Sequence, residues 1–318
     1  MQLNELVNNL IEQNEKYPIV NFSFTVLLYI WFGILIILIL DFKKQILNKT
    51  YRILLILILI GLSIPVYANN IERFWITKKE NTFKIAKNKD SIIKARFAVF
   101  SDIHLGLFKD ERFATQVIKE VNNLENIDAV LVPGDLTYEP RIEDLARYFA
   151  PFKDSKYPII MVLGNHDLEK PGPKIRKELE KVLIEVGVTL IDDKDINIKG
   201  VNIYGLQDKW ISEYSTNIIK DLKPNQINLV LAHQPDVVRD YDTLNIKPDL
   251  TITGHTHCGQ VRIPYLYNKH LPTVDNYYDK GLYQTNNGQL YITCGVGEVG
   301  LPIRLFNPPV IDIINIQN

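Results

Sequence analysis

Two uninterrupted apolar runs dominate the hydrophobic pattern at the start of this chain. Residues 22–40 contain no charged side chain, and as a helix they would extend about 28 Å at 1.5 Å per residue. Residues 53–68 form a second run, which is slightly short for a membrane span unless Tyr51 and Arg52 extend their polar ends to the interface. We therefore predict an N-terminal membrane region at 1–68, in which two spans form a transmembrane helical hairpin.

A buried helical hairpin or a secretory signal peptide would also produce apolar runs. A signal peptide begins with a basic segment, whereas residues 1–16 contain three glutamates and one lysine, and no small-x-small cleavage site follows the first run. We therefore favour membrane spans. The loop 41–52 is rich in Lys and Arg, so the positive-inside tendency places it in the cytoplasm and the following domain on the outer face. The basic residues within 73–84 favour the opposite orientation.

The pattern becomes polar after the second run and then periodic. Residues 69–94 are rich in Lys and Asn, and we expect a tether there, with Phe74 and Trp75 in the interfacial layer. From residue 95, short apolar strands alternate with amphipathic helices, which predicts a mostly parallel sheet. The strands are expected at 96–100, 128–132 and 157–163, and the helices at 111–124, 141–149 and 173–186.

After Gly187 the strands follow one another closely. They are expected at 188–191, 195–198, 201–205, 227–232, 250–253, 261–263, 290–293 and 310–316. We expect them to form a second, more antiparallel sheet that packs face to face with the first. The predicted fold class is α/β, with two facing mixed β-sheets flanked by helices in four layers, and the catalytic domain comprises residues 95–318.

Charge and cysteine content narrow the function classes. The chain has 36 Lys and Arg against 37 Asp and Glu, and this balance gives no support to a nucleic-acid partner. The two cysteines, Cys258 and Cys294, are too few for a disulfide framework and do not settle the redox compartment. Cys258 is next to His257 and is a candidate thiolate ligand, but the carboxylate and amide ligands nearby favour a harder metal.

Residues that commonly bind metals follow the ends of several predicted strands. Five of the six histidines lie at such positions, and His270 is the exception. Because side chains at i and i+2 of a strand share a face, His255 and His257 would project together beyond the strand that precedes them. Ligands collect at the carboxyl ends of strands in α/β folds, so we expect the other candidates to converge there. The full set of seven comprises Asp102, His104, Asp135, Asn165, His233, His255 and His257.

Seven ligands are too many for one ion with an open coordination position and suit two ions. With one bridging carboxylate, such a centre polarises water from both sides, and its ions lie about 3.5–4 Å apart. The sequence therefore predicts a phosphoester hydrolase centre.

The order of these motifs resembles the calcineurin-like metallophosphoesterase superfamily from about residue 96 to residue 316. The motifs are Asp-x-His, Gly-Asp, Gly-Asn-His-Asp, a single His and Gly-His-x-His. The runs 254–264 and 295–309 are similar to a membrane-associated bacterial branch that also has an N-terminal hydrophobic anchor. Many members of that branch have Gly where this chain has Cys258, so this chain has an oxidisable thiol beside the site.

The resemblance implies a role for each candidate. Asp102, His104 and His257 would hold the first metal, Asp135 would bridge, and Asn165, His233 and His255 would hold the second. His166 would stand over the phosphate and neutralise charge or protonate the leaving oxygen, with Asp167 orienting its ring. The expected reaction is in-line attack by a metal-bound hydroxide on a phosphoester or pyrophosphate. The cofactors would be two divalent or trivalent ions, with manganese favoured and iron or zinc as alternatives.

Other residues have structural as well as functional interpretations. Asp192, Asp193 and Asp195 fit a solvated hairpin turn better than a cation site. Arg262 and Arg304 are candidate phosphate contacts or members of a solvent-facing strand surface. The segment containing Tyr265, Tyr267, Tyr277, Tyr278 and Tyr283, with His270 inside it, would shape substrate access or pack on the surface.

We therefore expect a multi-pass protein of the bacterial inner membrane whose partners are the lipid bilayer and a phosphorylated small-molecule or lipid-linked substrate. A second hypothesis is a UDP-2,3-diacylglucosamine pyrophosphohydrolase of lipid A synthesis, whose substrate is cytoplasmic. A third is a metal-binding scaffold without activity, which the complete ligand set disfavours.

Overall fold

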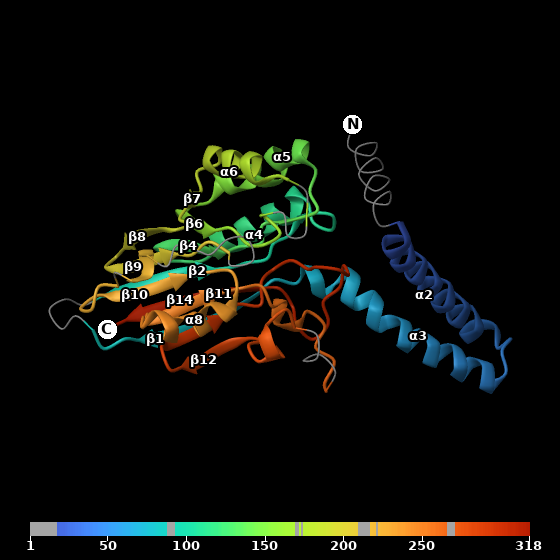
Figure 1. Ribbon diagram of the computed structural model, residues 1–318. Coiled ribbons are helices and arrows are strands. Elements are labelled where there is room, and N and C mark those ends of the chain that lie inside the picture. Colours follow the sequence, from blue (N-terminus) through green and yellow to red (C-terminus); the bar gives the residue numbers. More distant parts are fainter. Residues whose placement is uncertain are drawn as a thin grey trace.

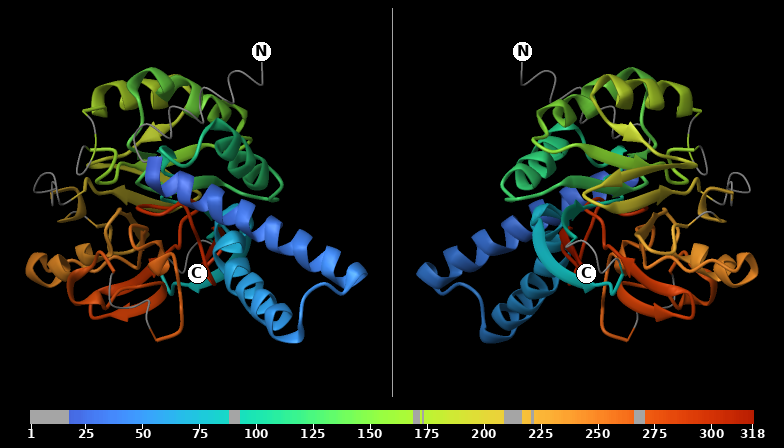
Figure 2. Two further views of the ribbon diagram at one scale, coloured as in Figure 1. Left: turned by 90° about the vertical axis from the view of Figure 1, so that its right-hand side faces the viewer. Right: turned by 90° about the vertical axis from the view of Figure 1, so that its left-hand side faces the viewer.

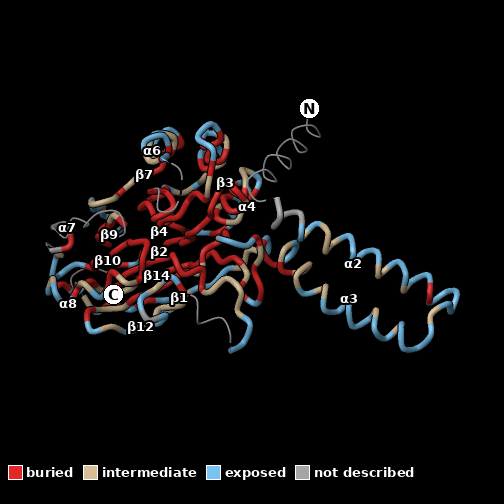
Figure 3. Tube along the Cα trace, turned by 45° about the vertical axis from the view of Figure 1, so that its right-hand side comes forward, coloured by how far each residue is buried: buried red, intermediate tan, exposed pale blue. Residues whose placement is uncertain are grey.

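A hairpin of two apolar helices stands apart from an α/β domain in the computed structural model (Figure 1). The structure describes residues 18–87, 93–168, 172, 174–208, 217–220, 222–265 and 271–318. The hairpin consists of α2 (Pro18–Lys44) and α3 (Lys49–Asn70). Both helices are long and apolar enough to cross a membrane, and their most apolar windows are 0% and 6% buried. Figure 3 shows that their surfaces are exposed or intermediate along most of their length.

Two polar contacts hold the helices of the hairpin together. Near the turn, Arg52 forms an ion pair with Asp41 at 2.6 Å. Farther along, the indole N–H of Trp31 donates to the hydroxyl of Ser63 at 2.8 Å. The two helices therefore form one unit, whose outward surface is almost entirely apolar.

The end of α3 is fixed to the α/β domain by buried polar contacts. The backbone N–H of Arg304 donates to the carbonyl of Ala68 at 3.2 Å. In the 3-10 turn η1 (Glu72–Phe74), Arg73 forms a buried ion pair with Glu298 at 2.5 Å, and Lys109 lies 3.5 Å from the same carboxylate. The hairpin therefore joins the domain through a rigid contact.

The first sheet has six strands and is mixed. Their spatial order is β1 (Thr77–Lys84), β14 (Val310–Gln317), β2 (Lys94–Val99), β4 (Ala129–Pro133), β6 (Ile159–Val162) and β7 (Thr189–Leu190). Strand β1 pairs in parallel with β14, from Thr77 opposite Val310 to Lys84 opposite Gln317. Part of the segment for which we expected a tether is therefore an edge strand of this sheet.

The second sheet also has six strands. Their spatial order is β12 (Gly281–Thr285), β13 (Gly288–Ile292), β11 (Leu250–Thr253), β10 (Ile227–Leu231), β9 (Val201–Gly205) and β8 (Lys194–Ile198). Its four central strands are parallel and its two edge pairs are antiparallel. The first sheet has one antiparallel pair, so the second is the more antiparallel of the two, as expected.

Three expectations about this part of the chain were wrong. The terminal strand β14 and the short strand β7 both belong to the first sheet, because β14 inserts between β1 and β2 and β7 pairs with β6. Residues 261–263 form a single bridge from Val261 to Leu305 in place of a strand.

Helices cover the outer face of each sheet, which confirms the predicted four-layer fold class (Figure 2). The first sheet is covered by α4 (Glu111–Asn122), η2 (Ile142–Asp144), α5 (Leu145–Phe149), η3 (Ala150–Asp154) and α6 (Arg176–Glu185). The second packs against α7 (Asn217–Lys220), η4 (Pro235–Arg239) and α8 (Asp240–Leu244). A third cluster lies between the sheets and includes Phe97, Leu131, Leu229 and Ile252, each 0% exposed. A short pair, β3 (Leu105–Gly106) and β5 (Thr137–Tyr138), and the turns η5 (His257–Gly259) and η7 (Val274–Asn276) complete the described elements.

The packing of the sheets brings the candidate site close to the foot of the hairpin. Asn307 donates its backbone N–H to the carboxylate of Glu72 at 2.6 Å and its side-chain amide to the carbonyl of His257 at 2.7 Å. One residue thus contacts both the segment after α3 and the loop that carries two candidate metal ligands.

The buried ion pair at the foot of the hairpin gives a stability prediction. Replacing Arg73 by Met leaves Glu298 buried without its closest cation, and we expect a loss of about 3 kcal/mol in the free energy of unfolding. The matched control is Arg112→Met, which removes an ion pair of a 67%-exposed side chain and should cost about 0–1 kcal/mol. Chemical unfolding of the full chain in detergent measures both, and equal losses would contradict the structural role of Arg73.

Candidate metal centre

Six of the seven predicted ligands gather in two buried groups at the carboxyl ends of the central strands. Asp102, His104 and His257 form the first group, and Asp135, His233 and His255 form the second. Within each group the candidate ligand atoms lie within 4.8 Å of one another. Asn165 joins the second group, since its side-chain oxygen lies 3.1 Å from Nε2 of His233.

Asp135 lies between the two groups. Its Oδ2 is 3.1 Å from Nε2 of His233 and 3.6 Å from Nε2 of His104. A single carboxylate oxygen is therefore within reach of both groups, which is the position of a bridging ligand.

Hydrogen bonds on the far side of the imidazole rings fix which nitrogen faces the centre. Nδ1 of His104 lies 3.0 Å from the carbonyl of Thr137, and Nδ1 of His233 lies 2.8 Å from that of Pro133. A carbonyl accepts only from an N–H, so Nε2 of each ring is directed inward. His255 is reversed, because its Nε2 contacts the carbonyl of Pro272 at 2.9 Å and its Nδ1 faces inward. Such outer hydrogen bonds are typical of metal-binding histidines.

Two pairs of ring nitrogens face each other at hydrogen-bond distance. Nε2 of His104 lies 3.1 Å from Nε2 of His257, and Nδ1 of His255 lies 3.0 Å from Nε2 of His233. Burial lowers the pKa of His104 and of His255 to about 3, and it holds that of His257 well below its usual range. His104 and His257 are therefore neutral near pH 7, and the outer bond of His104 turns a lone pair toward its neighbour. A metal ion between such nitrogens would accept their lone pairs once any proton between them is displaced, so the donor set fits two metal ions.

The carboxylates respond to burial in different ways. Burial raises the pKa of Asp102 to about 7. Burial also acts to raise the pKa of Asp135, but the charge and hydrogen bond of His233 outweigh it and hold the value well below the usual range. Burial would lower the pKa of His233, yet the carboxylate of Asp135 raises it to about 10. Without metal, His233 and Asp135 therefore form an ion pair.

The backbone around the centre turns sharply where the strands end. Strand β11 ends at Thr253, so His255 and His257 lie in a turn, and the strand alternation used to place them does not apply. Both have positive φ angles, 70° and 48°. Asp102, His104 and Asp135 do so too, and backbone strain of this kind is typical of functional sites.

Two glycines allow the ligand loops to approach closely. A Cβ at Gly164 would overlap the carboxylate of Asp135, and one at Gly254 would overlap that of Asp102. This explains why the motifs begin Gly-Asn-His-Asp and Gly-His-x-His.

His166 lies above the first group, with 9% of its surface exposed. Its ring packs edge-on against His104, with the centroids 5.1 Å apart, and against Tyr138 at 5.2 Å. Its backbone N–H donates to Asp135 at 3.0 Å. Its Nδ1 is buried without a hydrogen-bond partner among the described residues, and this leaves a polar atom beside the centre.

Asp167 does not orient the ring of His166, contrary to expectation. Its carboxylate accepts hydrogen bonds from the backbone N–H groups of Leu136, Thr137 and Gly164 at 2.9–3.0 Å. These bonds fix the loop that follows Asp135, so Asp167 positions the shared carboxylate. Tyr138, which packs against both His104 and His166, was missed because a tyrosine after a Gly-Asp motif carries no recognisable signal.

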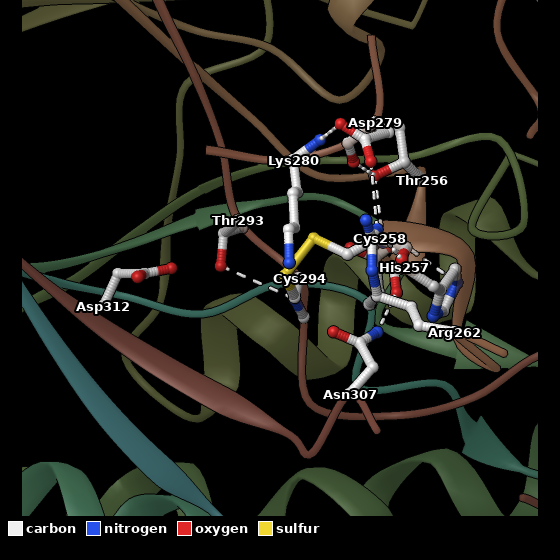
Figure 4. The surroundings of a disulfide bond; sticks show 12 residues. Thr256, His257, Cys258, Arg262, Asp279, Lys280, Thr293, Cys294, Asn307 and Asp312 are labelled. Atoms are coloured by element: carbon white, nitrogen blue, oxygen red, sulfur yellow. Dashed lines mark hydrogen bonds and ion pairs between the residues drawn. A yellow bond between two sulfur atoms is a disulfide. The ribbon is translucent and has the colours of Figure 1, made fainter. Parts of the chain in front are cut away.

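The two cysteines form a disulfide bond beside the site (Figure 4). Cys258 directly follows the candidate ligand His257, and Cys294 follows β13. Cys258 is therefore not a thiolate ligand, as the harder ligands nearby indicated, and the oxidisable thiol beside the site is oxidised to a disulfide. The sequence alone does not indicate that two cysteines 36 residues apart form a disulfide bond. The bond forms because β11 and β13, which precede them, are neighbours in the sheet.

The remaining candidates take structural positions. Arg304 is fully buried and donates to the carbonyls of Gly297, Asn307 and Cys294, so it does not contact a phosphate. Arg262 forms an ion pair with Asp279 at 3.0 Å. Asp192 accepts a hydrogen bond from the backbone N–H of Leu163 at 3.1 Å. The rings of Tyr277, Tyr278 and Tyr283 pack together, and Tyr267 and His270 lie outside the described residues.

A family match covers the part of the chain that contains all seven candidate ligands. Residues 95–259, more than half of the chain, match the family described as calcineurin-like phosphoesterase. A metallophosphoesterase of Campylobacter jejuni is 28% identical over 87% of this chain and 76% of its own length. The phosphodiesterase YaeI of Escherichia coli is 26% identical over 68% of this chain and 80% of its own. A crystal structure from Thermus thermophilus is similar with a TM-score of 0.42 and 14% identity, over 65% of this chain and 91% of that one.

The shifted pKa values predict how metal uptake depends on pH. Metal binding must remove a proton from His233 at any pH below about 10, and from Asp102 below about 7, whereas His104 and His255 hold none. We expect about two protons released at pH 6 and about one at pH 8, so that affinity falls as pH is lowered through 7. Calorimetric titration with Mn²⁺ in buffers of different ionisation enthalpy measures the number of protons released. Release that does not change between pH 6 and pH 8 would contradict the assignment.

Proposed function

Because the chain belongs to the calcineurin-like phosphoesterase family, we propose that it is a membrane-anchored phosphohydrolase with a dinuclear metal centre. The observation that carries the proposal is the position of Asp135, whose one oxygen is within reach of both buried ligand groups. The seven ligands would be divided as the family resemblance implies, with three on the first ion, three on the second and Asp135 shared.

The two ions would supply the polarisation of a water molecule and of the phosphoryl oxygens. Manganese is the ion we favour, with iron or zinc as alternatives, since imidazole and carboxylate ligands accept all three.

The chain's own residues supply orientation and proton transfer. His166 presents an unpartnered ring nitrogen beside the centre, where a leaving oxygen would accept a proton. The contacts of His104 and Tyr138 with its ring hold this side chain in place. Asp167 acts indirectly, through the hydrogen bonds that fix the loop of Asp135.

The apolar hairpin supports an anchor in the bacterial inner membrane, and the disulfide supports an outer-face location. The two helices expose their apolar surfaces, in contrast to the core helices of a soluble protein. Disulfide bonds persist outside the reducing cytosol, and the basic loop between the spans agrees with that orientation.

A lipid-linked phosphoester or pyrophosphate is the substrate class that an anchored enzyme of this kind would reach. The UDP-2,3-diacylglucosamine hypothesis requires a cytoplasmic active site, so the disulfide disfavours it. A scaffold without activity is disfavoured because every predicted ligand lies at the centre. The direct test is to measure hydrolysis of monoesters, diesters and lipid-linked pyrophosphates by the Mn²⁺-loaded, detergent-solubilised protein. If the protein binds two ions but releases no product from any of these substrates, the proposal that it is an enzyme is wrong.

Substituting His166 separates catalysis from metal binding. We expect His166→Asn to lower kcat by about 10²- to 10⁴-fold while the protein retains two ions, because its ring transfers a proton and binds no metal. Steady-state kinetics and elemental analysis of the same sample measure both. A variant that loses one ion would show that His166 is a ligand.

Asp167→Asn should behave differently. The amide keeps one acceptor oxygen and replaces the other by an NH₂ group. Either the backbone N–H of Gly164 or that of Thr137 loses its acceptor, so the loop of Asp135 shifts. We expect metal content to fall together with kcat. Full metal content with reduced kcat would mean that Asp167 acts on the chemistry directly.

The redox state of the two cysteines tests the orientation. In intact cells treated with an alkylating reagent before lysis, we expect Cys258 and Cys294 to remain unmodified until a reductant is added. A gel shift with a polymer-linked maleimide counts the cysteines released, and cells reduced before alkylation provide the control. If both cysteines are alkylated in cells that received no reductant, the domain lies in the cytoplasm.

A further inference from the structure

We propose that exposed apolar side chains around the foot of the hairpin form an apron that dips into the bilayer surface and holds the metal centre at the level of the lipid head groups. The apron consists of Ile71, Trp75, Ile263, Leu301 and Phe306. This inference rests on the proposed membrane anchorage and adds a second, independent contact between the catalytic domain and the lipid.

The apron comes from three segments that are hydrogen-bonded to one another. The end of α3 contacts the loop 299–307, where the amide of Asn69 donates to the carbonyl of Pro302 at 2.6 Å. That loop contacts the segment after η5, since the amide of Gln260 donates to the carbonyl of Leu301 at 3.0 Å and the N–H of Arg262 to that of Leu305 at 2.8 Å. Figure 1 shows this loop, in red, beside the domain end of α3.

The side chains of the apron are exposed although their neighbours are buried. Phe306 is 65% exposed, whereas Leu305 and Asn307 on either side are 7% and 6% exposed. Phe306 also has a φ of 56°, which is unusual for a bulky residue. Asn307 is tied to Glu72 and His257, so the fixed backbone holds the Phe306 ring in solvent.

Continuity with the hairpin identifies the occupant of this surface as lipid. The apron begins at Ile71 and Trp75, which are 53% and 59% exposed and lie directly after the second apolar helix. Residues that follow a membrane span lie in the interfacial layer, where Trp and other large apolar side chains are favoured. Ile263, Leu301 and Phe306 extend the same surface onto the domain.

The apron adjoins the loop of the metal ligands. Asn307, next to Phe306, donates to the carbonyl of His257 at 2.7 Å, and Gln260 lies three residues after that ligand. An apron seated in the interface therefore places the centre beside the layer in which lipid phosphates lie. It gives a physical reason for a substrate whose phosphoryl group is carried by a membrane lipid.

Fluorescence quenching by brominated lipids tests the apron in the full chain. Three proteins with a single tryptophan would be placed in phosphatidylcholine bilayers that carry bromine on the acyl chains. One keeps only Trp31 of α2; the second has Phe306→Trp, and the third Ile184→Trp, each as its sole tryptophan. Ile184 on α6 is 65% exposed, like Phe306, and is the matched control.

We expect about twofold quenching or more at position 306 with bromine near the head groups, quenching of Trp31 with bromine deeper in the chains, and none at position 184. Quenching of Trp31 without quenching at position 306 overturns the apron and leaves the anchor intact. No quenching at Trp31 overturns the anchor of the proposed function itself. Equal quenching at positions 306 and 184 also overturns the apron, because it shows that the domain contacts the lipid without a preferred face.

Discussion

The close packing of buried imidazole and carboxylate ligand atoms around one oxygen of Asp135 determines much of this structure. His104 and His257 direct nitrogens at each other at 3.1 Å, and Asp135 offers one oxygen to both ligand groups. The protein holds these groups close together with outer hydrogen bonds and close glycine contacts, and the ligand loops have strained backbone angles. The two sheets supply the rigid strand ends from which these loops start.

Contacts beyond the ligands connect the centre to the rest of the chain. Asp167 fixes the loop of Asp135, the disulfide ties the residue after His257 to the end of β13, and Asn307 links the carbonyl of His257 to Glu72 at the foot of the hairpin. The segment after α3 is therefore part of the catalytic domain, packed by the buried Arg73–Glu298 pair. If the hairpin is the membrane anchor that we propose, these contacts would set the height and direction of the centre relative to the membrane.

Local sequence patterns were sufficient to predict the fold class and to predict that the candidate ligands would meet. Strand ends and the ligand-type residues that follow them can both be recognised from a few neighbouring residues. Contacts between distant segments were not accessible in this way. The placement of β14 in the first sheet, the role of β1 (Thr77–Lys84) as its partner and the Cys258–Cys294 bond all depend on which strands become neighbours. The role of Asp167 was misjudged for a related reason, since its backbone partners lie about thirty residues earlier in the chain.

Anomalous scattering from crystals of the Mn²⁺-loaded protein would show whether two metal ions share Asp135. We expect two peaks about 3.5–4 Å apart, one beside Asp102, His104 and His257 and the other beside Asn165, His233 and His255, with the carboxylate of Asp135 contacting both. A single peak at full Mn²⁺ loading, or two peaks without Asp135 between them, would contradict it.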